Sequence, residues 1–338
     1  MEHHRGKRSI VFPQPPVILS WASVAGKKEA QGPLGDTFDL TSQDTTFGQK
    51  SWEKAETQMQ KAALRLALEK GGLTEEDLDA AFVGDLLNQC IGSSFSMRNR
   101  GIPTFGLYGA CSTMAEGLLL AGLAVSGGFC RRALALTSSH FASSERQYRF
   151  PLGYGGQRTP TAQWTVTGAG AVVLGSKGTG PFLERATIGT IVDAGIKDAN
   201  NMGAAMAPAA FETIRAHFDD FHCAPEEYDL IVTGDLGRLG SELVRELFAQ
   251  EGVRLGSRYR DCGVMIFDLQ KQDVHCGGSG CGCSASVLCG DLLRRMQRGT
   301  LKKLLFCGTG ALLSPLSTQQ GESIPAVCHA VSIAAERS

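Results

Sequence analysis

The sequence has few of the features that mark membrane, secreted or nucleic-acid-binding proteins. No apolar run approaches the length of a membrane-spanning helix, and no apolar signal-peptide region follows the basic residues 1–8, because three prolines interrupt residues 12–16. Basic and acidic residues nearly cancel, 33 against 34, so the net charge of −1 gives no reason to expect nucleic acid as a partner. The glycine-containing string at 308–310 is too short for a nucleotide-binding loop.

Cysteine is not scarce, but its count does not point to disulfides. The 11 cysteines are an odd number in a long chain of 338 residues, which fits a reducing compartment. Hydrophobic residues make up 43% and charged residues 20% of the chain, as in ordinary globular proteins. The length is sufficient for two core-forming domains or one large duplicated domain.

The most informative segment is residues 105–113, Phe-Gly-Leu-Tyr-Gly-Ala-Cys-Ser-Thr. Its apolar start predicts a buried strand, and the apolar positions from Met114 to Val125 predict a helix directly after it. Cys111 is therefore expected at a strand-to-helix turn, where free N–H groups and the helix dipole lower the pKa of a thiol. Such a cysteine can be a nucleophile, or its turn can bind an anion without chemistry. The simpler alternative is a small buried hydrophobic residue.

The two halves of the chain repeat each other. Residues 76–86 resemble residues 226–236, and in both segments acidic residues precede an apolar strand that ends in Gly-Asp-Leu. Asp85 thus corresponds to Asp235, and both are expected to end equivalent strands. Each points into one of two related site regions or caps a local turn.

Further elements support a duplication. Helices are predicted over residues 52–70 and 204–221, one before each strand, and Thr74 with Asp77 forms the pattern of a capping box. Three more pairs of segments repeat in the same order: 109–112 with 281–284, 131–137 with 302–308, and 169–174 with 326–333. The prediction is an α/β fold with two mixed sheets around paired central helices that begin near Cys111 and Cys283. The predicted halves are residues 1–178, which carry Cys111, and residues 179–338.

A long loop is predicted over residues 138–167, which lack clear periodicity. Loops of this length are usually functional or interfacial. Arg146 and Arg149 in it are candidates for holding a carboxylate in bidentate fashion, together with His140. The alternative is that both arginines are solvated surface residues.

This duplicated pattern, with a cysteine at the first central helix, resembles the thiolase-like fold of thiolases and ketoacyl synthases over nearly the whole chain. The resemblance implies two mixed sheets and their helices in a layered α/β/α/β/α arrangement. Several strings resemble, more specifically, a family of stage V sporulation proteins that are components of the dipicolinic acid channel of spore-forming Firmicutes. These strings are residues 32–35, 84–89, 109–113, 137–140, 203–210 and 308–315.

The resemblance to this sporulation family implies function and location. It implies binding of dipicolinic acid, as the free acid or its calcium chelate, for uptake into the developing spore and release on germination. It implies a location peripheral on the inner spore membrane, with the membrane channel subunits of the same system as partners. No cofactor is expected. By analogy with the fold, the chain is expected to form a homodimer through the strand at 105–108.

The catalytic set of the condensing enzymes is incomplete in this chain. The resemblance implies a histidine after the strand 231–235 and a second His or Asn in the glycine-rich turn 275–281, where they polarise a thioester carbonyl and move protons. Gly234 and Asp235 stand at the first position, and His275 precedes the glycines at the second. A binding protein without catalysis is therefore the first hypothesis.

Two alternatives stay open. One is an acyltransferase or ketoacyl-synthase-like enzyme that uses Cys111 as nucleophile with His275 or His140 as base. The other is a scaffold for membrane channel subunits that binds no small molecule. A zinc cluster is not expected, because His275, Cys276, Cys281 and Cys283 fit no standard ligand spacing.

The candidate ligand-binding residues lie at the ends of the predicted strands, in the turn of the cysteine and in the long loop. They are Cys111, Ser112, Asp85, Asn88, His140, Arg146, Arg149, Asp235, Ser279 and Thr309.

Overall fold

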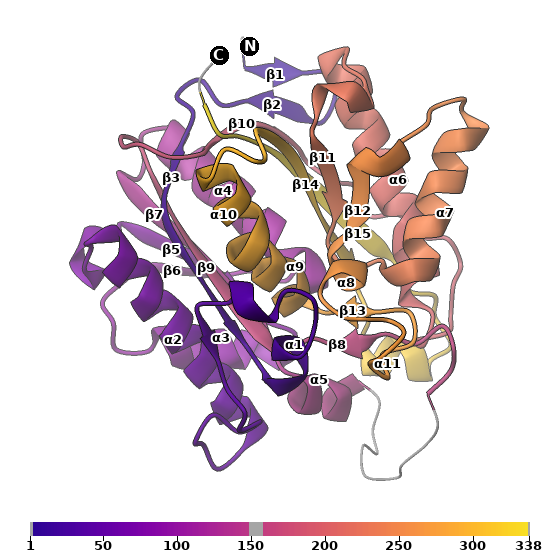
Figure 1. Ribbon diagram of the computed structural model, residues 1–338, viewed down its shortest axis with the longest axis horizontal. Helices are drawn as coiled ribbons and strands as arrows, with labels where there is room; N and C mark the ends of the chain where they lie inside the picture. The colour runs from indigo at the N-terminus through magenta and orange to yellow at the C-terminus, as the bar shows by residue number, and fades with distance from the viewer. Residues whose placement is uncertain (1–2, 149–157, 337–338) are drawn as a thin grey trace.

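The computed structural model describes residues 3–148 and 158–336 (Figure 1). In the N-terminal half the strands lie in the order β3 (Val17–Ala25), β9 (Gly168–Gly175), β7 (Arg132–Ser139), β5 (Ala80–Gly84) and β6 (Thr104–Gly106). In the C-terminal half the order is β10 (Phe182–Thr187), β15 (Ala326–Ala334), β14 (Lys303–Ala311), β11 (Leu230–Thr233) and β12 (Tyr259–Asp261).

The pairing is the same in both halves. The first two pairings of each order are antiparallel and the last two are parallel. This repeated topology confirms the predicted duplication. The two mixed sheets are continuous where Val17 of β3 pairs with Phe182 of β10. The strand β2 (Ser9–Val11) of the N-terminal half also pairs with β10 in antiparallel orientation.

Helices form three layers around the two sheets (Figure 1). The central layer contains α4 (Thr113–Ser126) and α9 (Cys281–Val287), which continues through a π-helical turn (Leu288–Leu292) into α10 (Leu293–Gln297). Outside the N-terminal sheet lie α2 (Trp52–Gly71) and α3 (Ile91–Met97); outside the C-terminal sheet lie α6 (Met202–Phe221) and α7 (Gly237–Gln250). The predicted α/β/α/β/α arrangement is therefore confirmed.

Local sequence explains why the long helices form where they do. The side chain of Ser51 accepts a hydrogen bond from Lys54 N at the start of α2, and Gly72 ends the helix with a φ of +60°. The sequence of α4 is apolar on nearly all its faces, as expected of a helix that is covered by a sheet on both sides. The predicted capping box of Thr74 and Asp77 is also present.

Two glycines of β14 allow the turn before α4 to lie directly on the strand. A Cβ atom at Gly310 would be 2.3 Å from the carbonyl oxygen of Gly109, and one at Gly308 would be 2.6 Å from the Cβ of Ala115. Neither position can accept a larger residue unless the backbone moves. The glycines at 308 and 310 thus have a packing explanation.

The predicted loop at 138–167 is wrong in part. Its described residues include α5 (Phe141–Tyr148) and β8 (Trp164–Thr165), and β8 pairs in parallel with β13 (Gly278–Ser279). The buried side chains of α5 are small or polar, so the segment lacks the apolar period from which a helix is recognised. No predicted element corresponds to β3 or β10, the strands at which the two sheets meet.

The remaining elements are short: β1 (His4–Arg5), β2 (Ser9–Val11), β4 (Leu40–Thr41), α1 (Lys27–Ala30), α8 (Cys262–Met265) and α11 (Pro315–Gln319). The predicted boundary after residue 178 falls between β9 and β10 and stays a prediction. None of the helices in the described part of the chain has the length and apolar character needed to cross a membrane.

Candidate functional site

Cys111 lies at the predicted place in the fold. It follows β6 in a 3-10 turn (Ala110–Ser112) that leads directly into α4. The prediction that this strand is buried is wrong, because β6 is an edge strand and all its residues are exposed. Ala110 has a φ of +50°, a conformation that is costly for a residue with a side chain and is often found at functional sites. The side chain of Cys111 is buried, with 5% of the residue exposed.

The close partner of Cys111 is an acid from the other half of the chain. The thiol donates a hydrogen bond to the carboxylate of Asp235, which follows β11. This carboxylate also accepts hydrogen bonds from Gly280 N at 2.8 Å, Thr309 Oγ1 at 2.8 Å and Ser279 Oγ at 3.4 Å. Burial raises the pKa of Asp235 to about 6, although the hydrogen bonds from Cys111 and Gly280 oppose this shift.

The lowered pKa expected for Cys111 is wrong. Burial raises the pKa of its thiol well above the usual range, and the negative charge of Asp235 raises it further. The position at the end of a helix lowers a thiol pKa only where solvent or a cation compensates the loss of water. Cys111 is therefore a protonated thiol and a hydrogen-bond donor.

The expected anion site at the cysteine already holds a carboxylate of the protein itself. Gly280 is the N-cap of α9, and its N–H group points at Asp235. This N–H group and the positive end of the helix therefore stabilise Asp235. Any ligand bound beside Cys111 has to use other donors.

A small cavity adjoins the cysteine. Its volume is about 40 Å³, and it is lined by Leu86, Ala110, Cys111, Ser144, Tyr148, Thr165, Met202, Ser279, Ala311 and Leu313. By volume it accommodates about three water molecules, at ~10–15 Å³ for each. The lining comes from both halves of the chain and combines hydroxyl groups with apolar side chains.

One hydroxyl group of the cavity is available to a ligand. Ser144 Oγ is buried and has no hydrogen-bond partner among the described residues. The other two hydroxyls of the α5 side are engaged: Tyr148 donates to Leu86 O at 2.5 Å, and Thr165 donates to Glu145 Oε1 at 3.0 Å. A buried hydroxyl without a partner is costly, so Ser144 is the strongest candidate donor to a bound molecule.

Four of the predicted ligand-binding residues lie together: Cys111, Asp235, Ser279 and Thr309. Ser112 is their neighbour, but its hydroxyl donates to Gly109 O at 2.7 Å inside the same turn. The structure thus brings the two predicted central turns together at one end of the sheets.

Asp85 and Asn88 lie elsewhere. The carboxylate of Asp85 accepts hydrogen bonds from Leu87 N at 2.8 Å and from Ser93 N and Oγ at 2.7 Å each. Asn88 is exposed, and its N–H group donates to Gln147 Oε1 at 2.9 Å. Neither side chain lines the Cys111 cavity.

Neither histidine proposed as a base lies beside the cysteine. His140 is buried; its Nε2 is 2.7 Å from Thr45 O, its Nδ1 accepts from Ala142 N, and burial lowers its pKa. The Nε2 of His275 is 3.4 Å from the exposed carboxylate of Asp273. Neither histidine is among the residues that line the cavity.

The placement of Arg146 in a carboxylate-binding loop is wrong. Arg146 belongs to α5, where Ser144 and Tyr148 face the cavity and Arg146 faces away from it, as helical spacing requires. Its guanidinium forms a half-exposed ion pair with Glu53 and lies 5.3 Å from the centroid of the Trp52 ring, both on α2. Arg149 lies outside the described residues.

The cysteines around the glycine turn are separate. Cys276 donates to Pro160 O and Cys281 donates to Ser138 O, in different directions. Within residues 3–148 and 158–336, no group of three or more His, Cys, Asp or Glu side chains is arranged to hold a metal ion.

Sequence reasoning missed Ser144, Tyr148 and Met202 as lining residues. A helical interpretation of α5 would have placed Ser144 and Tyr148 on one face, since they are four residues apart. No pattern in the sequence shows that Met202, at the start of α6, reaches a cavity formed mainly by the other half.

Comparison with solved structures shows which fold the chain adopts. The chain is similar to 3-oxoacyl-[acyl-carrier-protein] synthase III from Aquifex aeolicus, with a TM-score of 0.57 and 15% identity, covering 94% of this chain and 99% of the other. It is similar to a variant of OleA from Xanthomonas campestris, with a TM-score of 0.62 and 16% identity, covering 96% and 99%. At this identity the likeness concerns the fold, which is thiolase-like and duplicated.

Sequence comparison then gives the family. The profile of the stage V sporulation protein AD family matches residues 6–334. The stage V sporulation protein AD of Bacillus subtilis (strain 168) is 44% identical over 326 residues, which is 96% of both chains. The chain therefore belongs to the stage V sporulation protein AD family.

Proposed function

We propose that this sporulation protein binds dipicolinic acid, as the free acid or its calcium chelate, in the cavity beside Cys111 and does not catalyse a reaction on it. In this proposal the protein supports uptake of the ligand into the forespore and its release on germination. Family membership supports the role in sporulation. The choice of ligand rests on the resemblance of the sequence strings to the sporulation family.

The contact between Cys111 and Asp235 is the observation that supports binding without catalysis. A thiol becomes a nucleophile when a neighbouring base or cation favours the thiolate. Here burial and the negative charge of the neighbouring Asp235 both raise the pKa of the thiol, so the thiolate is disfavoured. No histidine lines the cavity among the described residues, so the side chain that the resemblance implies for polarising a thioester carbonyl is not found there.

The ligand requires the cavity to widen. Dipicolinate is a pyridine ring with two carboxylates and exceeds the volume of about three water molecules. Met202 and Leu313 form the part of the lining best able to move, because one is a flexible thioether and the other is half-buried. In the widened cavity Ser144 Oγ donates to one carboxylate.

Titration calorimetry of the purified protein with dipicolinic acid, with and without calcium, tests the proposal. We expect saturable binding that Ser144→Ala weakens about tenfold, because the one unpartnered hydroxyl is lost. Arg146→Ala is the matched control on the opposite face of α5, and its affinity should stay within twofold. Absence of saturable binding in both conditions would refute the proposal.

The alternative of an acyltransferase has a separate readout. If Cys111 is a nucleophile, incubation with acyl-coenzyme A yields a mass increase of one acyl group that is lost in Cys111→Ala. We expect no such adduct, because the thiol stays protonated beside Asp235.

We also propose a homodimer through β6, and a membrane channel subunit of the same sporulation system as a partner at the inner spore membrane. The two outer edges of the sheets differ: all three residues of β6 are exposed, with Phe105 at 57%, whereas Tyr259 and Asp261 of β12 are buried. An exposed strand edge with an aromatic side chain favours pairing with another strand. Light scattering at micromolar concentration should give a dimer in the wild type and a monomer in Phe105→Asp.

A further inference from the structure

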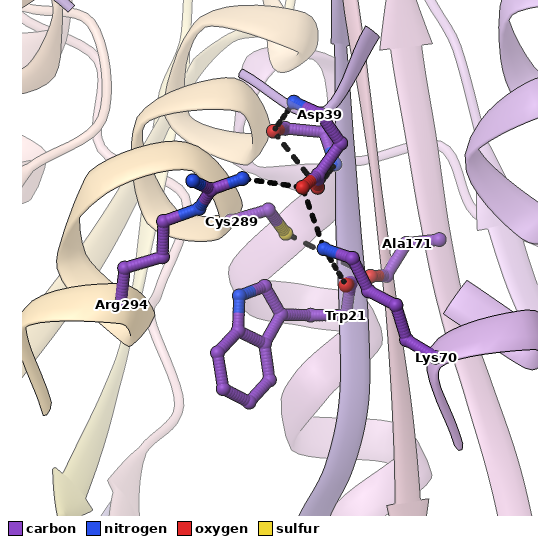
Figure 2. Close-up of polar contacts among 7 residues, drawn as sticks. Trp21, Asp39, Lys70, Ala171, Cys289 and Arg294 are labelled. Carbon is purple, nitrogen blue, oxygen red and sulfur yellow. Dashed lines mark hydrogen bonds and ion pairs between the residues drawn. The ribbon is translucent and has the colours of Figure 1, made fainter. Parts of the chain in front are cut away.

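A second hollow lies away from the Cys111 cavity, between β3, the end of α2 and α10 (Figure 2). Its volume is about 430 Å³, roughly ten times that of the cysteine cavity. It is lined by Leu19, Ser20, Trp21, Asp39, Lys70, Arg294, Gln297 and Arg298. The two cavities share no lining residue.

Three basic side chains and one acidic side chain line this hollow. Figure 2 shows Lys70 and Arg294 approaching Asp39 from opposite sides, and both pair with the same oxygen, Oδ1. The other oxygen of Asp39 accepts from Ser23 N at 2.9 Å, which holds the carboxylate on β3. One carboxylate therefore balances one of the two cations that it touches.

Arg298 adds a further positive charge at the rim. It is exposed, directly after α10, and no ion pair holds it among the residues that the structure describes. With Lys70 and Arg294 against Asp39, the hollow has an excess of two positive charges at neutral pH. Such a concentration of cations attracts anions, and arginine in particular binds phosphate and carboxylate groups.

Two buried donors on β3 also lack partners. Trp21 Nε1 and Ser20 Oγ have no hydrogen-bond partner among the described residues, and the two residues are only 8% and 3% exposed. In Figure 2 the nitrogen edge of the Trp21 indole faces the side on which Arg294 lies. A buried N–H group without a partner is costly, and it points here to an acceptor that the chain itself does not supply.

We propose that this hollow, formed by Trp21, Lys70, Arg294 and Arg298, is a binding site for a small multivalent oxyanion. The ligand carries phosphate or carboxylate groups, which take the free hydrogen bonds of the two arginines and of Lys70. Asp39 is the internal competitor of the ligand, since it occupies one oxygen position between Lys70 and Arg294. This proposal does not rest on dipicolinate binding at Cys111.

A structural role alone explains only part of the cluster. The Lys70–Asp39–Arg294 bridge links the N-terminal half to α10 and contributes to their contact. It leaves unexplained why Arg298 faces the same hollow without an acid, and why two donors on β3 are buried without acceptors. A ligand anion accounts for all of these observations together.

Calorimetric titration of the full chain with sodium pyrophosphate and, separately, with dipicolinate at constant low ionic strength tests the site. We expect saturable binding of pyrophosphate that Arg298→Gln weakens about tenfold, because a charge-assisted hydrogen bond is lost. Arg295→Gln, three residues earlier in α10, is the matched control, since Arg295 pairs with Asp291 outside the hollow. It should change the affinity less than twofold.

Asp39→Asn provides a test of opposite sign. The amide still accepts from Ser23 N, but it no longer competes for Lys70 and Arg294, so pyrophosphate should bind several-fold more tightly. If the cluster is only a structural bridge, Asp39→Asn lowers stability and leaves anion affinity unchanged or absent. Because Arg298 is exposed, its variant keeps the test valid even if Asp39→Asn fails to fold.

The outcomes separate the two sites of the molecule. If Arg298→Gln weakens the binding of dipicolinate, and if pyrophosphate competes with dipicolinate, the ligand of the hollow carries carboxylate groups. If pyrophosphate binds without competing with dipicolinate, the ligand carries phosphate groups. Wild-type protein without saturable pyrophosphate binding, or equal losses in Arg295→Gln and Arg298→Gln, would overturn the proposal. Loss of dipicolinate binding in Ser144→Ala alone concerns only the Cys111 cavity.

Discussion

Asp85 and Asp235 end equivalent strands, β5 and β11, and stand in the same Gly-Asp-Leu sequence, yet they bind different parts of the molecule. Asp85 accepts from Leu87 and Ser93, so it ties α3 to its own half. Asp235 reaches the cysteine turn of the other half.

This difference shows that the two halves share the same arrangement of strands, whereas the equivalent acids make different contacts. In the N-terminal half the acid is a local structural group, as its Asx-type bond to Leu87 N shows. In the C-terminal half the equivalent acid meets the N-terminus of α9 and the thiol of Cys111. Both strand ends lie near the cavity, since Leu86 lines it, but of the two acids only Asp235 contacts Cys111.

The largest expected effect comes from removing the acid of the N-terminal half. Asp85→Ala leaves Leu87 N and both donors of Ser93 buried without an acceptor, which should lower the free energy of unfolding by about 4 kcal/mol. Urea denaturation followed by circular dichroism measures this change. Asp273→Ala, at an exposed acid, is the control and should cost less than about 0.5 kcal/mol. An equally small decrease in unfolding free energy in Asp85→Ala would show that the hydrogen bonds to Asp85 contribute little to stability.

The acid of the C-terminal half should appear in the pH dependence of stability. The pKa of Asp235 is raised by burial from 3.8 to about 6, so its contribution to stability is complete below about pH 4 and is lost as the pH rises through 6. The difference in unfolding free energy between the wild type and Asp235→Asn should therefore change by about 3 kcal/mol across this window. Urea denaturation between pH 4 and 7.5 measures it, and a constant difference would contradict the raised pKa.

Thiol reactivity distinguishes the two acids directly. Asp235→Asn removes the negative charge beside Cys111, so the pKa of the Cys111 thiol should fall. The rate at which iodoacetamide alkylates Cys111 should therefore rise about tenfold. Asp85→Asn should leave the rate unchanged. Peptide mass spectrometry assigns the modified residue, and the half-buried Cys223 serves as the internal reference. Equal rates in both variants would mean that access, and not charge, limits the reaction.

The smallest effect is expected at the equivalent cysteines. Cys111→Ala should weaken dipicolinate binding by about 1 kcal/mol, the value of one hydrogen bond, and should keep the fold because alanine suits a helix start. Cys283→Ala, at the corresponding position in the other half, should leave the affinity unchanged, since Cys283 does not line the cavity. Calorimetric titration compares the two variants. A larger loss in Cys283→Ala would reverse the assignment of the site to the N-terminal turn.

Much of the fold was predictable because it depends on local patterns. The strand and helix around Cys111, the helices α2 and α6 and the matching Gly-Asp-Leu segments all follow from periodicity and small residues. The helix α5 could not be predicted in this way, because its buried residues are small or polar: Ala142, Ser143, Ser144 and Glu145. Polar side chains are buried only when distant segments supply their hydrogen-bond partners. Ser143 Oγ, for example, donates a hydrogen bond to Glu56 Oε2 at 2.8 Å.

The candidate site was only half predictable for the same reason. Cys111, Asp235, Ser279 and Thr309 were chosen from strand ends and turns, and the repeat places these at one end of the sheets. Arg146 was chosen for its charge, but the turn of α5 directs it to Glu53 on the surface. The basic hollow was not foreseen, because Lys70, Arg294 and Asp39 are far apart in the chain.

The sequence by itself determined the duplication, the place of Cys111 at a strand-to-helix turn and the lack of a histidine after β11, because each is a matter of order and residue type. Only the tertiary structure decided the protonation of the thiol. The pKa of Cys111 depends on how much water is removed around it and on a carboxylate more than a hundred positions away, and neither is a local property of the chain.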